Sequence, residues 1–255
     1  MLFRSPKKDQ VFNFFNPVFW GAKDPDLFVD IMQIAAKQTS AYHFADNMFV
    51  FQRNNSMFHD EPFVKSWNDN ALSASDKGIV WRRYILAMAA YHCQHLEGDF
   101  VECGAYQGVG AKTVIDYLGG PDFAKTFWLY DVFEHSKDMV NHSMPEHGEQ
   151  LFDEVKARFK DYPRVHVIKG FLPEILKEGS PEKIAYLHLD LNQAPAEIAT
   201  LETLFERVVP GGMIILDDYE MLFYREQKFA EDTWFGQRGY KVFPLPTSQG
   251  FVIKR

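Results

Sequence analysis

Short apolar stretches alternate with amphipathic stretches from about residue 99 through residue 254, and this alternation limits the possible folds most strongly. Each apolar stretch has the length of one strand, whereas the stretches between them have helical periodicity. Strands that are apolar on both faces are typical of parallel sheets covered by helices. The predicted strands are 100–103, 126–130, 165–168, 184–189, 213–216, 241–243 and 250–254.

Turn and capping residues indicate where the helices between these strands begin and end. Ser75 or Asp76 can cap the first helix, and Gly and Pro clusters stop later ones. The last two strands are joined by a short Pro-containing turn, so they should pair antiparallel at one edge. The sequence therefore predicts an α/β fold, with helices on both faces of a mostly parallel sheet. The other expected helices are 109–118, 149–160, 173–177, 195–207 and 225–235.

Residues 1–74 have a different composition and residue pattern, and we predict that they form an N-terminal region separate from a domain over 75–255. They lack strand or helix periodicity and are rich in Phe, Asn, Asp and Met, which indicates short helices and aromatic-rich loops. The segment 42–58 carries several rings that could close over a substrate. The alternatives are a satellite core or a dimer interface, and an interface would make the protein a homo-oligomer.

Charge and cysteine content exclude several kinds of partner. The net charge is −8 without a Lys/Arg stripe, so no nucleic-acid partner is expected. No apolar run approaches the ~20 residues of a membrane-spanning helix, so no membrane association is expected. Cys93 and Cys103 fall in a helical and a strand pattern, where both are expected in the core. A reducing, cytoplasmic location is the expectation.

Acidic residues gather where the predicted strands end. Glu102, Asp131, Asp190, Asp217 and Asp218 all lie at or near the carboxyl ends of strands. Open α/β sheets bind ligands in the crevice outside these ends, so the five carboxylates are expected on one rim.

A glycine-containing turn follows the first strand, between Gly104 and Gly110. It matches neither GxGxxG nor a phosphate-binding loop, and by itself it is a weak signal. Asp131 follows 21 residues after Gly110 at the second strand end, where an acidic residue accepts hydrogen bonds from ribose hydroxyls. The two features together favour an adenosine-type ligand.

Asp190, Asp217 and Asp218 form a second constellation, because adjacent strands would bring them close together. Carboxylates at such short distances repel one another unless a cation or a shared proton compensates their charge. Oxygen ligands of this kind suit Mg²⁺ or another hard divalent cation. His188 shares the strand of Asp190, and we expect it to pack in the core beneath a helix.

At these residues the sequence resembles class I S-adenosylmethionine-dependent methyltransferases. More narrowly, it resembles the macrocin/mycinamicin O-methyltransferase family, which methylates sugar hydroxyls of macrolides. The similarity covers about residues 75–220, and Trp81, Arg82 and Arg83 also look like the family. The matching segments are 96–104, 129–134, 169–173, 187–190 and 210–219, of which the last is the most specific.

The resemblance implies a Rossmann-like sheet of seven strands and S-adenosylmethionine as the cofactor. It places the turn 102–104 at the methionine end, Asp131 at the ribose, and Gly170 with Phe171 near the adenine. It also implies that Asp190, Asp217 and Asp218 hold Mg²⁺ or a similar cation. The implied cofactor-binding residues are Glu102, Cys103, Gly104, Tyr106, Gly108, Asp131, Val132, Gly170, Phe171 and Asp190.

The chain departs from the family two residues after Asp190, where a frequent Asp is replaced by Asn192. Asn192 cannot accept a proton, so a base for the acceptor hydroxyl must come from elsewhere. A histidine in the loop 134–149 is the candidate, because its pKa lies near neutrality. We rank His142 first and His147 second, with Asp190 as the third catalytic residue, and His135 is expected to cap a turn.

The predicted function is metal-dependent methyl transfer from S-adenosylmethionine to a hydroxyl of a small acceptor of the sugar or natural-product type. A metal-dependent hydrolase would use the same carboxylates but would leave Asp131 and the glycine turn without a role. A nicotinamide dehydrogenase is disfavoured by the missing GxGxxG. A non-catalytic relative of the fold is the remaining alternative.

Overall fold

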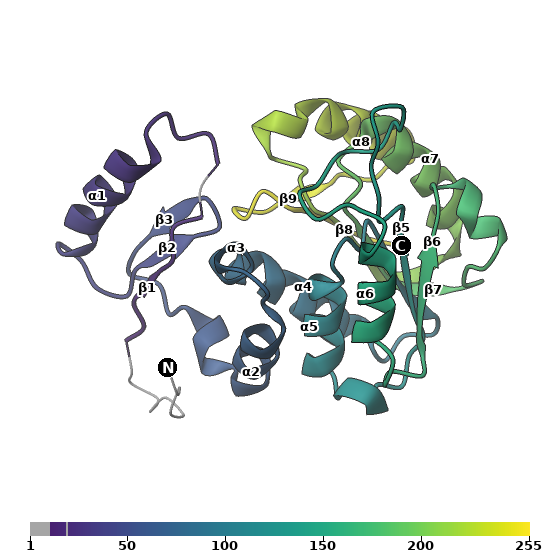
Figure 1. The fold of residues 1–255 in the computed structure, drawn as a ribbon, viewed down its shortest axis with the longest axis horizontal. Coiled ribbons are helices and arrows are strands. Elements are labelled where there is room, and N and C mark those ends of the chain that lie inside the picture. Colours follow the sequence, from purple (N-terminus) through teal and green to yellow (C-terminus); the bar gives the residue numbers. More distant parts are fainter. Residues whose placement is uncertain (1–10, 19) are drawn as a thin grey trace.

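The computed structural model describes residues 11–18 and 20–255; residues 1–10 and Phe19 of the predicted N-terminal region lie outside this description. Within the described chain the main sheet has seven strands in the order β6-β5-β4-β7-β8-β10-β9 (Figure 1). β4 to β8 run parallel, and β10 is antiparallel to both β8 and β9. The predicted fold class is confirmed. The strands are β4 (Asp99–Cys103), β5 (Phe127–Asp131), β6 (Val165–Lys169), β7 (Ile184–Leu189), β8 (Val208–Leu216), β9 (Phe243–Pro244) and β10 (Gly250–Ile253).

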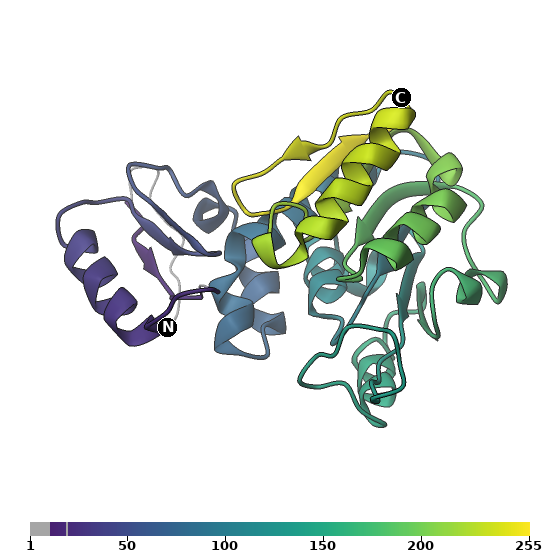
Figure 2. The ribbon, with the colours of Figure 1, turned by 90° about the horizontal axis from the view of Figure 1, so that it is seen from above.

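Helices cover both faces of this sheet. Three helices, α4, α5 and α6, pack on one face, and α7 and α8 lie side by side on the other (Figures 1 and 2). The helices are α1 (Pro25–Ala36), α2 (Glu61–Asn70), α3 (Ala74–Gly78), α4 (Val80–Cys93), α5 (Val109–Tyr117), α6 (Leu151–Arg158), α7 (Ala194–Leu204) and α8 (Arg225–Gln237). Short 3₁₀ turns are η1 (Ser56–His59), η2 (Gly120–Asp122), η3 (Glu174–Lys177), η4 (Phe205–Arg207) and η5 (Leu222–Tyr224).

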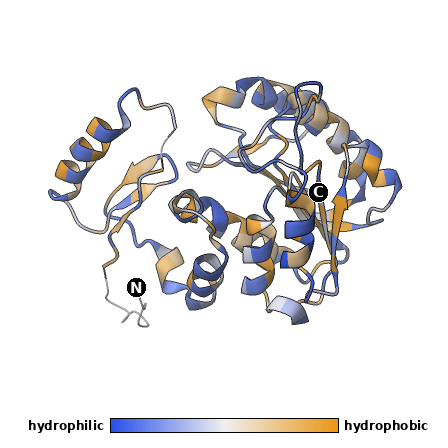
Figure 3. Ribbon diagram, viewed as in Figure 1, coloured by the Kyte–Doolittle hydropathy of each residue, from blue (hydrophilic) through white to orange (hydrophobic). Residues whose placement is uncertain are grey.

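Strand alternation divides the core into two layers. On β4, Phe100 packs with the α4–α6 layer, whereas Val101 and Cys103 pack with the α7–α8 layer. All three side chains are fully buried, and the strands of the sheet carry mostly hydrophobic residues (Figure 3). Burial of both faces is the reason that these strands read as continuous apolar runs.

The first predicted helix begins differently from the expectation. Ser73, rather than Ser75 or Asp76, is the N-cap of α3, and Asp76 completes a capping box with it. A capping box satisfies two backbone N–H groups, whereas a cap at Ser75 would satisfy one. The helical conformation is interrupted at Ile79 before α4 begins. The single helix that was expected here is therefore two helices, α3 and α4.

The N-terminal region contains a small sheet that its sequence did not indicate. β1 (Phe14–Phe15) pairs parallel with β2 (His43–Ala45), which forms a hairpin with β3 (Met48–Val50). Phe44, Met57 and Phe58 are buried, and the two η1 residues pack with α2 in a satellite core. For these side chains the structure favours the satellite-core alternative over a lid.

The outward face of α1 is apolar and exposed. Leu27, Ile31 and Ile34 recur on one helical stripe and are each more than half exposed, beside hydrophilic residues of the same helix (Figure 3). Among the described helices none has both the length and the apolar character needed to cross a membrane.

Candidate active site

The carboxyl ends of β4 and β7 approach each other closely, and Gly104 allows this approach. Gly104 has a φ of +92°, and a Cβ atom added there would lie 1.9 Å from the carbonyl oxygen of Asp190. A larger residue would therefore force the strand ends apart. The Gly104 amide also donates to the carbonyl of Tyr130 at 2.8 Å. The predicted turn consequently lies between the ends of β5 and β7.

A pocket of about 100 Å³ opens beside this turn. Six predicted cofactor-binding residues line it, together with both ranked histidines. The loop between β5 and α6 forms one wall. The lining residues are Gly104, Tyr106, Asp131, Val132, Asn141, His142, Met144, His147, Gly170, Leu172, Asp190, Leu191 and Asn192.

Asp131 is held rigidly at the pocket wall by backbone amides. Its Oδ2 accepts the N–H of Tyr106 at 2.7 Å, and its Oδ1 accepts the N–H of Phe133 at 2.6 Å. Burial raises the pKa of this carboxyl. A carboxylate fixed in this way presents its remaining lone pairs in a defined direction.

Four predicted cofactor-binding residues do not line the pocket. Glu102 points to the face of the sheet covered by α4 and α5, where its Oε1 lies 2.8 Å from His188 Nδ1. Cys103 is fully buried in the other layer, and burial raises the pKa of its thiol well above the usual value. Gly108 begins α5 with a φ of +72°, and a Cβ atom there would lie 2.8 Å from the Phe159 ring. The fourth, Phe171, is 41% exposed.

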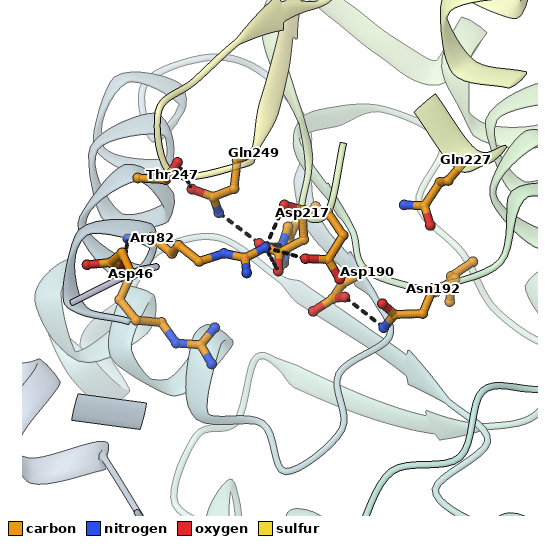
Figure 4. A network of polar contacts seen from close by, with 12 residues as sticks. Asp46, Arg82, Asp190, Asn192, Asp217, Gln227, Thr247 and Gln249 are labelled. Atoms are coloured by element: carbon orange, nitrogen blue, oxygen red, sulfur yellow. Dashed lines mark hydrogen bonds and ion pairs between the residues drawn. The ribbon is translucent and has the colours of Figure 1, made fainter. Parts of the chain in front are cut away.

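Arg82 joins the two adjacent aspartates at the end of β8 (Figure 4). Its Nη2 lies 2.7 Å from Asp217 Oδ2 and 2.6 Å from Asp218 Oδ1, and it also donates to the Asp217 carbonyl at 2.6 Å. All three residues are at least nine-tenths buried. The guanidinium therefore supplies part of the compensating positive charge that neighbouring carboxylates require. The sequence contained Arg82 in a family-like segment, but no local signal linked it to these aspartates.

Asp217 has more hydrogen-bond partners than Asp190 or Asp218. Its Oδ1 accepts from Gln249 Nε2 at 2.8 Å and lies 3.4 Å from His188 Nε2 (Figure 4). Burial opposes its charge, but Arg82 and His188 outweigh burial and hold the pKa of Asp217 below its usual range. His188 is buried as expected. Burial lowers its pKa, but hydrogen bonds to Asp217 and Glu102 outweigh that effect and raise the pKa to about 10.

Asp190 lies next to this network with fewer partners. Its Oδ1 accepts from Asn192 Nδ2 at 3.2 Å (Figure 4). Burial, followed by the charges of Asp217 and Asp218, raises its pKa well above the usual value. Ligand atoms from His188, Asp190 and Asp217 lie within 4.8 Å of one another. Asp190 and Asp217 therefore fit a hard divalent cation here. His188, with a raised pKa and both ring nitrogens facing carboxylates, carries a proton on each nitrogen and has no lone pair for a metal.

Asn192 fills the position where the family often has an acid. It has a φ of +57°, a conformation that Asn adopts more readily than most residues. Its Oδ1 is buried and has no hydrogen-bond partner among the described residues. Asn192 lines the pocket beside Asp190, and its buried oxygen is an acceptor that lacks a donor.

The two ranked histidines line the pocket but differ in their contacts. His147 Nδ1 accepts the N–H of Met144 at 3.2 Å, so the proton of the neutral ring is assigned to Nε2, which lies 3.9 Å from Asp131 Oδ1. That ring has no free basic nitrogen. His142 Nε2 lies 3.3 Å from Tyr224 Oη. Burial, then the charges of Asp218 and Asp190, raises the pKa of Tyr224 to about 12, so this hydroxyl is a donor.

The curated relatives include two O-methyltransferases. One is the 8-demethyl-8-(2,3-dimethoxy-alpha-L-rhamnosyl)-tetracenomycin-C 4'-O-methyltransferase of Streptomyces olivaceus, 28% identical over 140 residues, or 48% of this chain and 53% of that protein. The other is the demethyldecarbamoylnovobiocin O-methyltransferase of Streptomyces niveus, 27% identical over 143 residues, or 50% of this chain and 55% of that protein. The chain spans about half the length of the curated relatives it matches.

Solved structures share the fold. The O-methyltransferase NovP is 19% identical and superposes with a TM-score of 0.60, covering 91% of this chain and 99% of its own. The calicheamicin methyltransferase CalS11 is 15% identical, with a TM-score of 0.54 over 80% of this chain and 95% of its own.

A sequence profile described as macrocin-O-methyltransferase (TylF) matches residues 84–232, which is more than half of the 255 residues. The matched stretch runs from α4 to α8 and contains Asp131, Asp190, Asp217 and Asp218. The resemblance drawn from the sequence is thereby confirmed. The chain belongs to the macrocin-O-methyltransferase (TylF) family.

Proposed function

We propose that this protein is an S-adenosylmethionine-dependent O-methyltransferase that methylates a hydroxyl of a small, sugar-containing acceptor. One observation carries the proposal: a single pocket is lined both by Gly104 and Asp131 and by Asp190 and Asn192. The first pair suits a nucleoside, and the second suits a hydroxylated acceptor. Methyl transfer requires the two reactants to be held against each other, and family membership supports the same reaction.

Calorimetry tests this reaction class. The protein is titrated with S-adenosylmethionine, S-adenosylhomocysteine and NAD, each with and without Mg²⁺. Micromolar binding of the first two and no binding of NAD is the expected outcome. Binding of NAD alone would instead indicate a dehydrogenase, and binding of none of the three would favour a hydrolase or a non-catalytic relative.

The pocket is smaller than its proposed occupant. Its volume of about 100 Å³ compares with ~300–1,000 Å³ for sites that hold drug-sized ligands. His142 and His147 lie on the loop that forms one wall. We infer that this loop moves outward when the cofactor enters and then covers both reactants.

Asp131→Ala is expected to weaken S-adenosylhomocysteine binding by tenfold or more. In the proposed complex the fixed carboxylate accepts the ribose hydroxyls, and each bond to a charged acceptor is worth ~1.5–3 kcal/mol. Calorimetry on the wild type and the variant measures the change in affinity. Asp153→Ala, at an exposed position on α6, is the control and should bind as the wild type does. Equal affinities for all three proteins would contradict the role of Asp131.

The proposed metal site consists of Asp190 and Asp217, which have ligand atoms within 4.8 Å of each other, and of Asp218, which Arg82 holds beside Asp217. A divalent cation held there would act as a Lewis acid that lowers the pKa of the acceptor hydroxyl. Arg82 keeps Asp217 and Asp218 aligned, and Asn192 Oδ1 accepts a hydrogen bond from the hydroxyl.

His142 is proposed to take the proton of that hydroxyl at Nε2. Tyr224 donates toward the same nitrogen at 3.3 Å and so orients the ring. Because the Tyr224 hydrogen bond occupies the lone pair of Nε2, the proton passes to the Tyr224 oxygen while the tyrosine proton passes to His142 Nε2. As the bond from oxygen to the methyl carbon forms, the bond from that carbon to the cofactor sulfur breaks.

His142→Ala is expected to lower kcat about 100-fold, since general-base catalysis contributes ~10²–10⁴-fold. Tyr224→Phe should lower kcat about tenfold if the tyrosine relays the proton, and little if it only orients the ring. Rates are measured at saturating cofactor and Mg²⁺. His135→Ala is the control, because His135 is not a lining residue of the pocket; its ring contacts Asn141, which is one. Near-wild-type turnover in His142→Ala, His147→Ala and His135→Ala would exclude a histidine base.

The proposed class of acceptor is based on the names of the relatives. The name of the Streptomyces olivaceus relative describes methylation of the 4' oxygen in a rhamnosyl-bearing compound. An analogous deoxysugar on a natural product, with a second oxygen beside the methylated hydroxyl that can also bind a cation, is therefore the proposed acceptor.

A further inference from the structure

The hairpin between β2 and β3 reaches from the N-terminal region to the start of α4. Asp46 and Asn47 form its turn, with φ values of +52° and +57°, as a two-residue type I′ hairpin requires. The Asp46 amide donates to the carbonyl of Gly78 at 2.7 Å, at the junction between α3 and α4. The tip of the hairpin is therefore bonded to the chain immediately before α4.

The Asp46 side chain caps α4 from a distance of 35 residues. Ile79 occupies the N-cap position of α4 and makes no side-chain capping bond. Asp46 instead accepts the N–H of Trp81 with Oδ2 at 3.0 Å and the N–H of Arg82 with Oδ1 at 2.9 Å. An anion at this end of a helix is stabilised by the exposed amides and the helix dipole. His43 Nε2, 2.9 Å from Oδ2, completes the shell around a carboxylate that is 2% exposed.

The capped turn is the one that carries Arg82. Its backbone is bonded to Asp46, and its guanidinium is bonded to Asp217 and Asp218 (Figure 4). The side chain is enclosed along its length, with 5% exposure for the residue. A displacement of the first turn of α4 must therefore displace the guanidinium, because the buried side chain has little room to compensate.

We propose that Asp46 is a positioning residue of the active site. By seating the first turn of α4, it holds Arg82 where one guanidinium group bridges Asp217 and Asp218. The N-terminal region is then a structural part of the acceptor side of the site. This inference rests on the proposed function for its catalytic consequence, but the placement of Arg82 can be measured without cofactor, metal or turnover.

Asp46→Asn tests the proposal, because it keeps the size of the side chain but removes its charge and one acceptor oxygen. Asp60→Asn is the matched control: Asp60 accepts the N–H of Phe63 at the start of α2 and has no contact with Arg82. Asp46→Asn loses one of two capping bonds, and Asp60→Asn keeps its capping oxygen but loses the bond from the Tyr117 hydroxyl. Each variant therefore loses one hydrogen bond, and both should show a comparable decrease in Tm of a few degrees.

Nitrogen-15 NMR of the guanidinium reports on Arg82 directly. In the wild type, without ligands, a slowly exchanging guanidinium signal is expected that Arg82→Lys abolishes and thereby assigns. Asp46→Asn should lose or strongly broaden this signal, and Asp60→Asn should keep it. If Asp46→Asn does not fold, Asp46→Ser, which retains one capping oxygen, provides the comparison. An unchanged Arg82 signal in a folded Asp46 variant would overturn the proposal.

Kinetics then test whether the effect passes through Arg82. Asp46→Asn should lower kcat about tenfold, in the range of supporting residues around a metal site, with the KM for S-adenosylmethionine unchanged. In an Arg82→Lys background the same substitution should add less than twofold, because the two residues act as one unit. Multiplicative effects would contradict the proposal. A wild type without any methyl transfer would refute the proposed function, whereas the NMR result would still decide the role of Asp46.

Discussion

Asp190→Asn is expected to lower kcat by about 1,000-fold or more while S-adenosylhomocysteine still binds. Asp190 lies where β7 ends, beside the pocket and within reach of the other carboxylates. In the proposed site its carboxylate accepts one hydrogen bond, from Asn192. Lewis-acid stabilisation is worth several kcal/mol in the transition state, and each 1.36 kcal/mol is tenfold in rate. Replacing the carboxylate with an amide removes the ligand charge but preserves the shape of the side chain.

The measurement is steady-state turnover with excess Mg²⁺, beside calorimetry for the cofactor product. Asp99→Asn is the control: Asp99 lies at the opposite end of β4 and accepts from Trp128 Nε1 at 3.0 Å. It should keep wild-type turnover. A chelator should reduce the wild type to the level of the Asp190 variant. Full activity of Asp190→Asn, or of the wild type in chelator, would remove the metal from the mechanism.

Arg82→Met is expected to destabilise the protein by about 3–5 kcal/mol, because removing one partner of a buried ion pair leaves uncompensated charge. Arg82 is 5% exposed, and methionine retains much of its packing without the guanidinium. Asp217 and Asp218 would then repel each other and Asp190. Urea unfolding measured in chelator, with and without bound cofactor product, gives the change in the free energy of unfolding.

Arg83→Met on the same helix is the comparison. Arg83 lies 3.9 Å from Asp76 and makes no contact with Asp217 or Asp218 in the described structure, so its loss should cost less than the loss of Arg82. Mg²⁺ should recover part of the lost stability of Arg82→Met, since a ligand that binds only the folded state stabilises it by mass action. Equal stability of the two variants would mean that the carboxylates are compensated by another group.

The main sheet was predictable from the sequence because strands buried on both faces consist of continuous apolar residues, a pattern that is visible locally. β7, for example, spans Ile184–Leu189 both in the prediction and in the structure. The rim of carboxylates was predictable for the same reason: once the strands are parallel, their carboxyl ends meet at one edge. Asp131, Asp190, Asp217 and Asp218 therefore needed only the strand boundaries and the family-like segments.

The small N-terminal sheet has no such pattern in its sequence. Its strands have two or three residues, too short for an alternating pattern to be distinguished from a loop. The aromatic rings of this region indicated burial, but not whether they cover a substrate or one another. Only packing decided that Phe44, Met57 and Phe58 are enclosed.

The partners of the carboxylates depended entirely on tertiary structure. Arg82 and Asp217 are 135 residues apart, and Tyr224 and His142 are 82 apart. A sequence shows which groups need a partner, since a buried charge cannot remain uncompensated. It does not show which of many distant polar residues arrives there, because that choice follows from how helices and loops pack against the sheet. The chain alone thus determined the sheet and the acidic rim. Folding in three dimensions decided that Arg82 contacts Asp217 and Asp218, that Tyr224 contacts His142, and that Asp46 caps the helix that carries Arg82.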